Sequence, residues 1–157
     1  MSLKPSVERV RRTLWSMGLT PEVREFSEST RTAAEAASAI GTTVGQIAKS
    51  LVFMAGDEPF LVIASGANRV DMERVRRLLG KKITRPDAET VREVTGFSIG
   101  GVPPVGHAKR LRTFVDEDLL SFPIVYAAAG TPNVVFAVSP RDLIRITEAE
   151  VVDIKEG

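Results

Sequence analysis

Cysteine is absent from the sequence, and histidine, tryptophan and tyrosine each occur once in 157 residues. The absence of cysteine excludes disulfide bonds, thiolate metal ligands and a cysteine nucleophile. A single histidine, His107, excludes a metal site built from several imidazoles. We therefore expect a protein with no metal site and no cofactor.

Long apolar runs are also missing. The longest such stretches, SLVFMAG and IVYAAAG, are far shorter than the ~20 residues that a membrane-spanning helix needs. The N-terminus has no apolar signal-peptide core, so we expect a cytoplasmic protein with no membrane contact. The formal net charge is only +1, and the apolar fraction of 43% is ordinary for a globular domain. We expect residues 1–157 to form a single domain.

The spacing of apolar residues predicts both helices and strands. A capping box at Thr32 and Glu35 and a cap at Asp87 mark two helix starts. Predicted helices cover residues 5–18, 32–41, 69–80, 87–96 and 140–146. Predicted strands are Ser50–Met54 and Phe60–Ala64, paired as a hairpin, with others within 22–26, 81–85, 112–117, 122–130, 133–140 and 151–155. Without a regular βαβ rhythm, this predicts an α/β fold of the α+β type, with a mixed, largely antiparallel sheet flanked by helices.

The segment TGFSIGGVPPVGH, residues 95–107, concentrates glycine and proline. Gly100 and Gly101 allow close backbone approach, whereas Pro103 and Pro104 fix the chain that follows. Such a loop can present backbone N–H groups to a carbonyl oxygen or an oxyanion. A tight turn between two elements accounts for the same composition.

Three further features have both a functional and a structural interpretation. His107 has the side chain suited to general acid–base chemistry, but a lone histidine is often structural. Lys49 precedes an apolar strand, where burial beside a pocket would lower its pKa, or where it simply extends to solvent. The basic cluster between Arg74 and Arg85 suits phosphates or a solvated helix face. No Ser-His-Asp order, P-loop or Rossmann fingerprint is present.

Four segments occur in order along the chain: TRTAAEAASAIGTTVGQIAKSLVF, ASGANRVD, TGFSIGGVPPVGH and YAAAGTPNVVFAVSPRDL. Together they resemble the characteristic segments of the YbaK/EbsC family of aminoacyl-tRNA deacylases, which are related to the editing domain of bacterial prolyl-tRNA synthetase. The resemblance spans about residues 30–147. It implies hydrolysis in trans of the ester on a mischarged tRNA, most often tRNA(Pro) carrying a small amino acid such as alanine. Such editing is needed because one methylene supplies only ~1–3 kcal/mol of discrimination.

The resemblance also implies roles for individual residues. Lys49, Gly100, Gly101 and His107 match the catalytic positions, with loop amides holding the scissile carbonyl and Lys49 binding the ester region. The expected substrate contacts are Pro103, Pro104, Ala128, Ala129, Gly130, Phe53 and Ser65. The expected tRNA contacts are Arg74, Arg77, Lys81 and Lys82. The cysteine-editing relatives have a serine where this chain has Ala129, which argues against a simple cysteine-specific enzyme.

The expected partners are the 3′ end of an aminoacyl-tRNA and a prolyl-tRNA synthetase. Two other functions fit the same residues. The domain could bind tRNA or a nucleotide without hydrolysis, or it could act only when docked on a synthetase. The sequence indicates no oligomeric state.

Overall fold

Eight strands form one mixed sheet in the computed structural model, which describes residues 4–26 and 32–157. The strands are β1 (Val23–Glu25), β2 (Ile47–Ala55), β3 (Glu58–Ser65), β4 (Ile83–Thr84), β5 (Arg112–Asp116), β6 (Val125–Ala128), β7 (Val134–Val138) and β8 (Glu150–Val152). The helices are α1 (Pro5–Ser16), α2 (Ala33–Ile40), α3 (Met72–Leu79), α4 (Ala88–Thr95) and α5 (Pro140–Thr147), with 3-10 turns η1 (Val44–Gln46) and η2 (Glu117–Ser121). The first two residues of the resembling segment, Thr30 and Arg31, lie outside the described residues.

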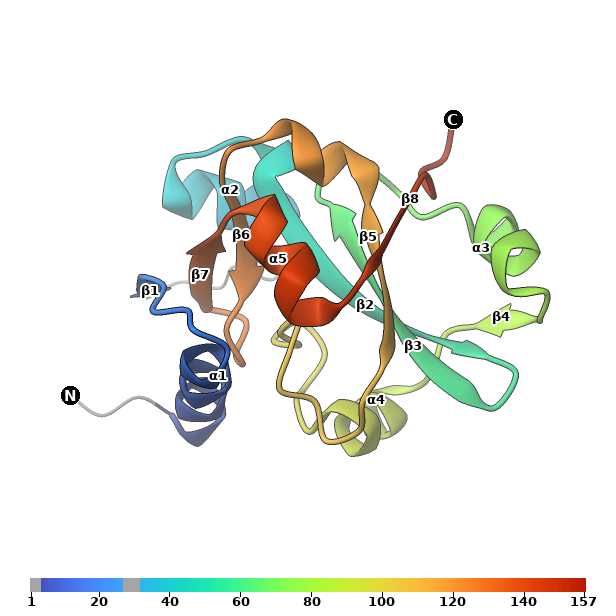
Figure 1. Ribbon diagram of the computed structural model, residues 1–157, viewed down its shortest axis with the longest axis horizontal. Helices are drawn as coiled ribbons and strands as arrows, with labels where there is room; N and C mark the ends of the chain where they lie inside the picture. Colours follow the sequence, from blue (N-terminus) through green and yellow to red (C-terminus); the bar gives the residue numbers. More distant parts are fainter. Residues whose placement is uncertain (1–3, 27–31) are drawn as a thin grey trace.

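The strand order is β1-β7-β6-β2-β3-β5-β8, and β4 pairs with β2 (Figure 1). The β1/β7, β2/β3, β2/β4 and β6/β7 pairs are antiparallel, whereas β2/β6, β3/β5 and β5/β8 are parallel. The predicted fold class, a mixed and largely antiparallel sheet with flanking helices in one domain-sized unit, is confirmed.

Helices cover both faces of the sheet. On one face, side chains of α1, α4 and α5 share a core cluster with Leu61 and Ile63 of β3. On the other face, Val75 of α3 packs with Phe60 and Val62, the intervening residues of the same strand. Alternate residues of a strand point to opposite faces, so β3 contributes to both cores and is buried along most of its length.

Local sequence signals set the helix ends. The Thr32 side chain accepts a hydrogen bond from the Glu35 N–H, and the Asp87 side chain accepts one from the Thr90 N–H. Both predicted caps are confirmed. Gly41 and Gly80 end their helices in the left-handed conformation, which costs glycine little.

The hairpin differs from its predicted limits. β2 begins at Ile47 rather than Ser50, because β6 pairs with its first two residues, so Lys49 lies within the strand and not at its entrance. Pro59, predicted in the turn, pairs with Met54 inside β3. Pairs in this ladder alternate between hydrogen-bonded and non-hydrogen-bonded, and Pro59 occupies a position whose N–H would point away from β2.

Candidate active site

One edge of β2 is paired at both ends and open in the middle. β6 pairs with Ile47 and Ala48, and β4 pairs with Met54 and Ala55. Across the described parts of the chain, no strand pairs with this edge over residues 49–53. The sheet therefore has a gap between β6 and β4, with β2 as its floor.

Two residues in this gap direct backbone groups into it. The Gly66 N–H donates to the Ile47 carbonyl at 2.7 Å, which places the odd-numbered residues of β2 in hydrogen-bonded pairs with β3. The N–H and C=O groups of Ser50 and Val52 consequently point away from β3, toward the open edge. A bound molecule can form hydrogen bonds there like those of an added strand.

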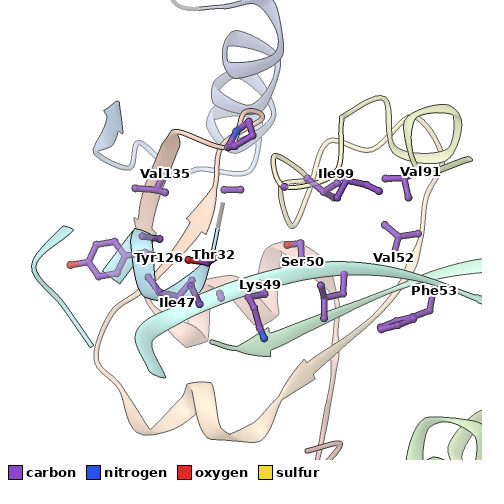
Figure 2. A pocket seen from close by; sticks show the side chains of 18 of the residues that line it. Thr32, Ile47, Lys49, Ser50, Val52, Phe53, Val91, Ile99, Tyr126 and Val135 are labelled. Carbon is purple, nitrogen blue, oxygen red and sulfur yellow. The ribbon is translucent and has the colours of Figure 1, made fainter. Parts of the chain in front are cut away.

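A cavity of about 340 Å³ lies against the open edge (Figure 2). It is formed by the start of α2, by β2, by the segment before α4, by the loop after α4 and by the β6/β7 region. The lining residues are Thr32, Ala33, Ala36, residues 47–53, Arg85, Pro86, Val91, Ile99, Gly100, Val102, Tyr126, Ala128, Pro132 and Val135.

The Ser50 hydroxyl is buried at this cavity without a hydrogen-bond partner among the described residues. Leaving a buried hydroxyl unsatisfied costs ~1–3 kcal/mol. A ligand that donates to or accepts from this oxygen would recover that cost. Ser50 and Lys49 point to opposite sides of β2, so the cavity has a polar group on each side of the strand (Figure 2).

Lys49 is held by a hydrogen-bonded network. Its Nζ donates to the Asn68 carbonyl oxygen at 3.0 Å. The Asn68 side-chain amide donates to carboxylates of Asp116 and Asp118, each at 2.8 Å. Asp116 is 1% exposed and also accepts from the Ser65 N–H at 3.0 Å. The network fixes the ammonium at the cavity wall.

The pKa of Lys49 is lowered, chiefly because burial disfavours its charged form. Asp116 opposes this shift and Arg69 adds to it. A partly buried ammonium beside a cavity is an effective partner for a carbonyl or an anion, since little water screens it.

The glycine-proline loop packs closely on the turn between β6 and β7. A Cβ at Gly101 would lie 2.7 Å from the Thr131 Cα and 3.0 Å from the Gly130 oxygen. Gly100 has a φ of 90° and lines the cavity. Within the described residues, the Gly100 N–H makes no hydrogen bond. This amide is a free donor in the loop, as an oxyanion site requires.

His107 contacts the loop rather than the cavity. Its Nε2 lies 2.6 Å from the Pro103 carbonyl oxygen, to which the neutral imidazole can donate. The pKa of His107 is lowered by burial and by the nearby Arg9 guanidinium, and the Pro103 contact opposes that shift. Neutral His107 is therefore favoured, and it acts on the loop conformation.

We expect the free energy of unfolding to decrease as the pH falls below about 6.5. Because the folded-state pKa of His107 is lowered, the unfolded chain binds more protons between the two pKa values, and acid favours it. Urea unfolding at pH 7.5 and 5.5 measures the loss. It should be larger for the wild type than for His107→Asn, and equal losses would contradict this role.

The structure brings some of the predicted substrate contacts together and separates others. Lys49, Phe53, Gly100 and Ala128 line the cavity. The remaining predicted residues are not among its lining residues: Gly101, Pro103, Pro104, His107, Ser65, Ala129 and Gly130. The Ser65 hydroxyl instead donates to the Gly45 carbonyl at 2.8 Å, and Ala129 is fully buried in the core. These two support the fold around the cavity.

The predicted tRNA contacts on α3 lie away from the cavity. Arg74 forms ion pairs with Asp71 and Asp153, and Arg74 and Arg77 line a separate hollow beside β8. Of the basic residues in the cluster, Arg85 is the one that lines the cavity, with its guanidinium 5.8 Å from the centre of the Phe53 ring. Lys81 and Lys82 are not lining residues.

Sequence reasoning did not select several lining residues, among them Ser50, Arg85, Ile99 and Tyr126. Ser50 had a signal, because it is a polar residue in the otherwise apolar run SLVFMA. The others come from separate elements, and only the fold brings them together. In the described residues, no group of three or more acidic or histidine side chains could hold a metal, and no helix is long and apolar enough to cross a membrane.

Comparison with known proteins identifies the family. The sequence profile of the aminoacyl-tRNA editing domain matches residues 27–146. The chain belongs to the aminoacyl-tRNA editing domain family. Its enzyme class is that of an aminoacyl-tRNA deacylase, as the resemblance implied. The segment from α2 to Ile146 in α5, with the whole cavity, lies within the match, whereas α1 and β1 precede it.

Individual relatives agree with this editing-domain assignment. The uncharacterized protein YwhH of Bacillus subtilis is 33% identical over 147 residues, covering 93% of this chain and 94% of YwhH. A proline–tRNA ligase of Bacillus licheniformis is 30% identical over 149 residues, covering 89% of this chain and 26% of the ligase. The crystal structure of a candidate trans-editing enzyme for prolyl-tRNA synthetase has a TM-score of 0.95 and 49% identity, covering 99% and 100% of the two chains. The predicted relation to the prolyl-tRNA synthetase domain is confirmed.

Proposed function

We propose that this editing domain acts in trans on tRNA(Pro) carrying a small non-cognate amino acid, with alanine as the first candidate. The observation that supports it best is the cavity on the open edge of β2, where the buried Ser50 hydroxyl lacks a partner. A bound polar molecule would supply hydrogen-bond partners for the Ser50 hydroxyl and for the backbone groups at the open edge of β2. The relation to a candidate trans-editing enzyme for prolyl-tRNA synthetase supports the choice of tRNA.

The cavity walls favour a small amino acid. Ala33, Val102 and Ala128 are short apolar side chains, and one cavity of about 340 Å³ has to hold both the amino acid and the terminal ribose. Ala128 lines the cavity, whereas Ala129 is buried in the core. The side chain at position 129 therefore affects the substrate indirectly, through its packing against the residues around the cavity. An apolar wall suits alanine better than a polar side chain.

The proposed reaction needs no nucleophilic side chain. A water molecule adds to the ester carbonyl carbon, and the Gly100 N–H stabilises the negative charge that develops on the carbonyl oxygen. The bond from carbon to the ribose oxygen then breaks, and that oxygen leaves with a proton as the free hydroxyl of the tRNA. The Lys49 ammonium holds the ester region, and Gly101, Pro103, Pro104 and His107 position the loop.

Single-turnover deacylation tests this proposal. The panel contains tRNA(Pro) charged separately with alanine, cysteine, serine, threonine and proline. We expect rapid release of alanine and no release of proline above the rate without enzyme, since hydrolysis of correctly charged tRNA(Pro) would defeat the purpose of editing. Proline–tRNA(Pro) is thus the matched control for the tRNA itself.

Two results would favour the other functions. Tight tRNA binding without release of any amino acid would indicate a binding module. Release that occurs only when prolyl-tRNA synthetase is added would indicate an accessory protein. Release of cysteine or serine ahead of alanine would retain the editing function and correct its substrate. The contribution of Arg74, Arg77, Lys81 and Lys82 to tRNA binding stays a prediction.

A further inference from the structure

The outward face of α1 combines positive charge with an exposed indole. Over residues 4–16 the chain has four basic residues, Lys4, Arg9, Arg11 and Arg12, and one acidic residue, Glu8. Trp15 is 70% exposed, the largest exposure among the exposed large apolar side chains. On the inward face of the same helix, Val7, Val10 and Leu14 are buried in the core. Packing of the core therefore accounts for the apolar residues of α1, but not for the exposed Trp15 and the basic residues around it.

The positive charge on α1 is only partly neutralised. Arg11 pairs with Glu8 on the helix surface. Lys4 and Arg12 have no acidic partner among the described residues. On α3, by contrast, Arg74 and Arg76 each pair with carboxylates. Arg77 on α3 and Lys81 and Lys82 after it also lack an ion pair among the described residues, so the exposed Trp15, rather than charge alone, distinguishes the α1 surface.

The helix α1 also lies against two segments that contribute lining residues to the cavity, the loop after α4 and the β6/β7 turn. The Arg9 guanidinium stacks 5.0 Å from the centre of the Phe97 ring, two residues before the cavity-lining Ile99. The N-terminal end of α1 contacts the β6/β7 turn, where a Cβ at Gly130 would lie 2.8 Å from the Ser6 oxygen. α1 and α3 lie at opposite ends of the molecule (Figure 1). A tRNA with its 3′ end in the cavity would place nearby phosphates close to α1.

We propose that the α1 face formed by Lys4, Arg9, Arg11, Arg12 and Trp15 is the docking surface for the acceptor arm of the tRNA. The basic side chains contact phosphates, and Trp15 stacks on an unpaired base near the 3′ end. Arginine, lysine and an exposed aromatic ring are the groups that bind single-stranded and duplex nucleic acid without reading its sequence. This inference rests on the proposed function, because it requires a tRNA substrate.

The salt dependence of binding tests the charged part of the surface. Affinity for uncharged tRNA(Pro) is measured between 50 and 200 mM salt for the wild type and for Lys4→Ala/Arg12→Ala. We expect the slope of log K against log[salt] to become shallower by about 1.4 to 1.8, because each lost phosphate contact removes ~0.7–0.9. Trp15→Ala should weaken binding about 5- to 140-fold with little change in slope, because stacking of one base contributes ~1–3 kcal/mol.

The matched control is Lys109→Ala/Arg141→Ala, which removes two exposed positive charges elsewhere. Its slope should stay near that of the wild type. Equal changes in slope for both double variants would show a general effect of net charge and overturn the α1 proposal. A shallower slope for Arg74→Ala/Arg77→Ala with none for the α1 variant would place the surface on α3 and also overturn it.

An aminoacyl ester of adenosine, which has no phosphates, separates the two proposals. One outcome is that the wild type hydrolyses this ester while the α1 substitutions leave the salt slope of tRNA binding unchanged. That outcome would overturn the docking surface and leave the proposed function in place. No hydrolysis of either the ester or the charged tRNA by the wild type would overturn the proposed function. Thermal unfolding of each variant confirms that the exposed substitutions leave the fold intact.

Discussion

Replacing Lys49 with alanine is expected to reduce single-turnover deacylation by about 10²- to 10³-fold, the range found when one charge-stabilising donor is removed from an active site. The ammonium is partly buried, lines the cavity and is fixed by the Asn68 carbonyl at 3.0 Å. Its interaction with the ester region is little screened by water, so no solvent molecule replaces it well. The rate is measured with enzyme in excess over the charged tRNA.

Lys155→Ala is the matched control for the Lys49 variant. The Lys155 ammonium pairs with Asp118 at 2.9 Å at the outer end of the same network, and Lys155 does not line the cavity. Its loss should change the rate by a few-fold at most, since exposed ion pairs contribute little. A Lys49→Ala enzyme with the wild-type rate would exclude Lys49 from the reaction.

Gly101→Ala is expected to lower the deacylation rate by about 10²-fold, because a displacement of ~1 Å in a catalytic group costs about that much. The new Cβ would lie 2.7 Å from the Thr131 Cα. Because the clash is with backbone atoms, it can be relieved only if the loop moves away from the β6/β7 turn. Gly100 would move with the loop and lose its place at the cavity. The free energy of unfolding should fall by about 1–3 kcal/mol from the overpacking.

Gly41→Ala separates the effect on the site from the effect on stability. Gly41 has a φ of 85° with no atom near a new Cβ, so alanine there strains the backbone without any clash. It should lower stability while the rate at 25 °C stays near that of the wild type. An unchanged rate in folded Gly101→Ala would show that the position of this loop does not govern the reaction.

Local signals predicted most of the secondary structure. The caps at Thr32 and Asp87 and the terminal glycines Gly41 and Gly80 act within one helical turn, so short-range chemistry decides them. Pro59 shows where this approach failed. Proline usually marks a turn, but here the ladder with β2 supplies a position that needs no N–H, and only the pairing partner creates that position.

The candidate site was predicted less completely than the fold. Lys49 and Gly100 were selected and line the cavity. Ser65 and Ala129 were selected with them but pack into the structure around it. Residues on the same strand or loop look equivalent in a sequence segment, whereas alternate side chains point to opposite sides. A family resemblance therefore indicates the segment more reliably than the side chain.

The sequence by itself determined the absence of thiol and multi-histidine chemistry, the helix caps at Thr32 and Asp87, and the family. Composition is a count over the chain, and helix caps act between residues a few positions apart, so neither needs the tertiary structure. The tertiary structure decided that β6 and β4 leave the middle of β2 unpaired, that Ser50 lacks a partner there among the described residues, and that α1 packs against the loop after α4. Each of these depends on contacts between segments distant in the chain, and such contacts form only when the whole sheet assembles.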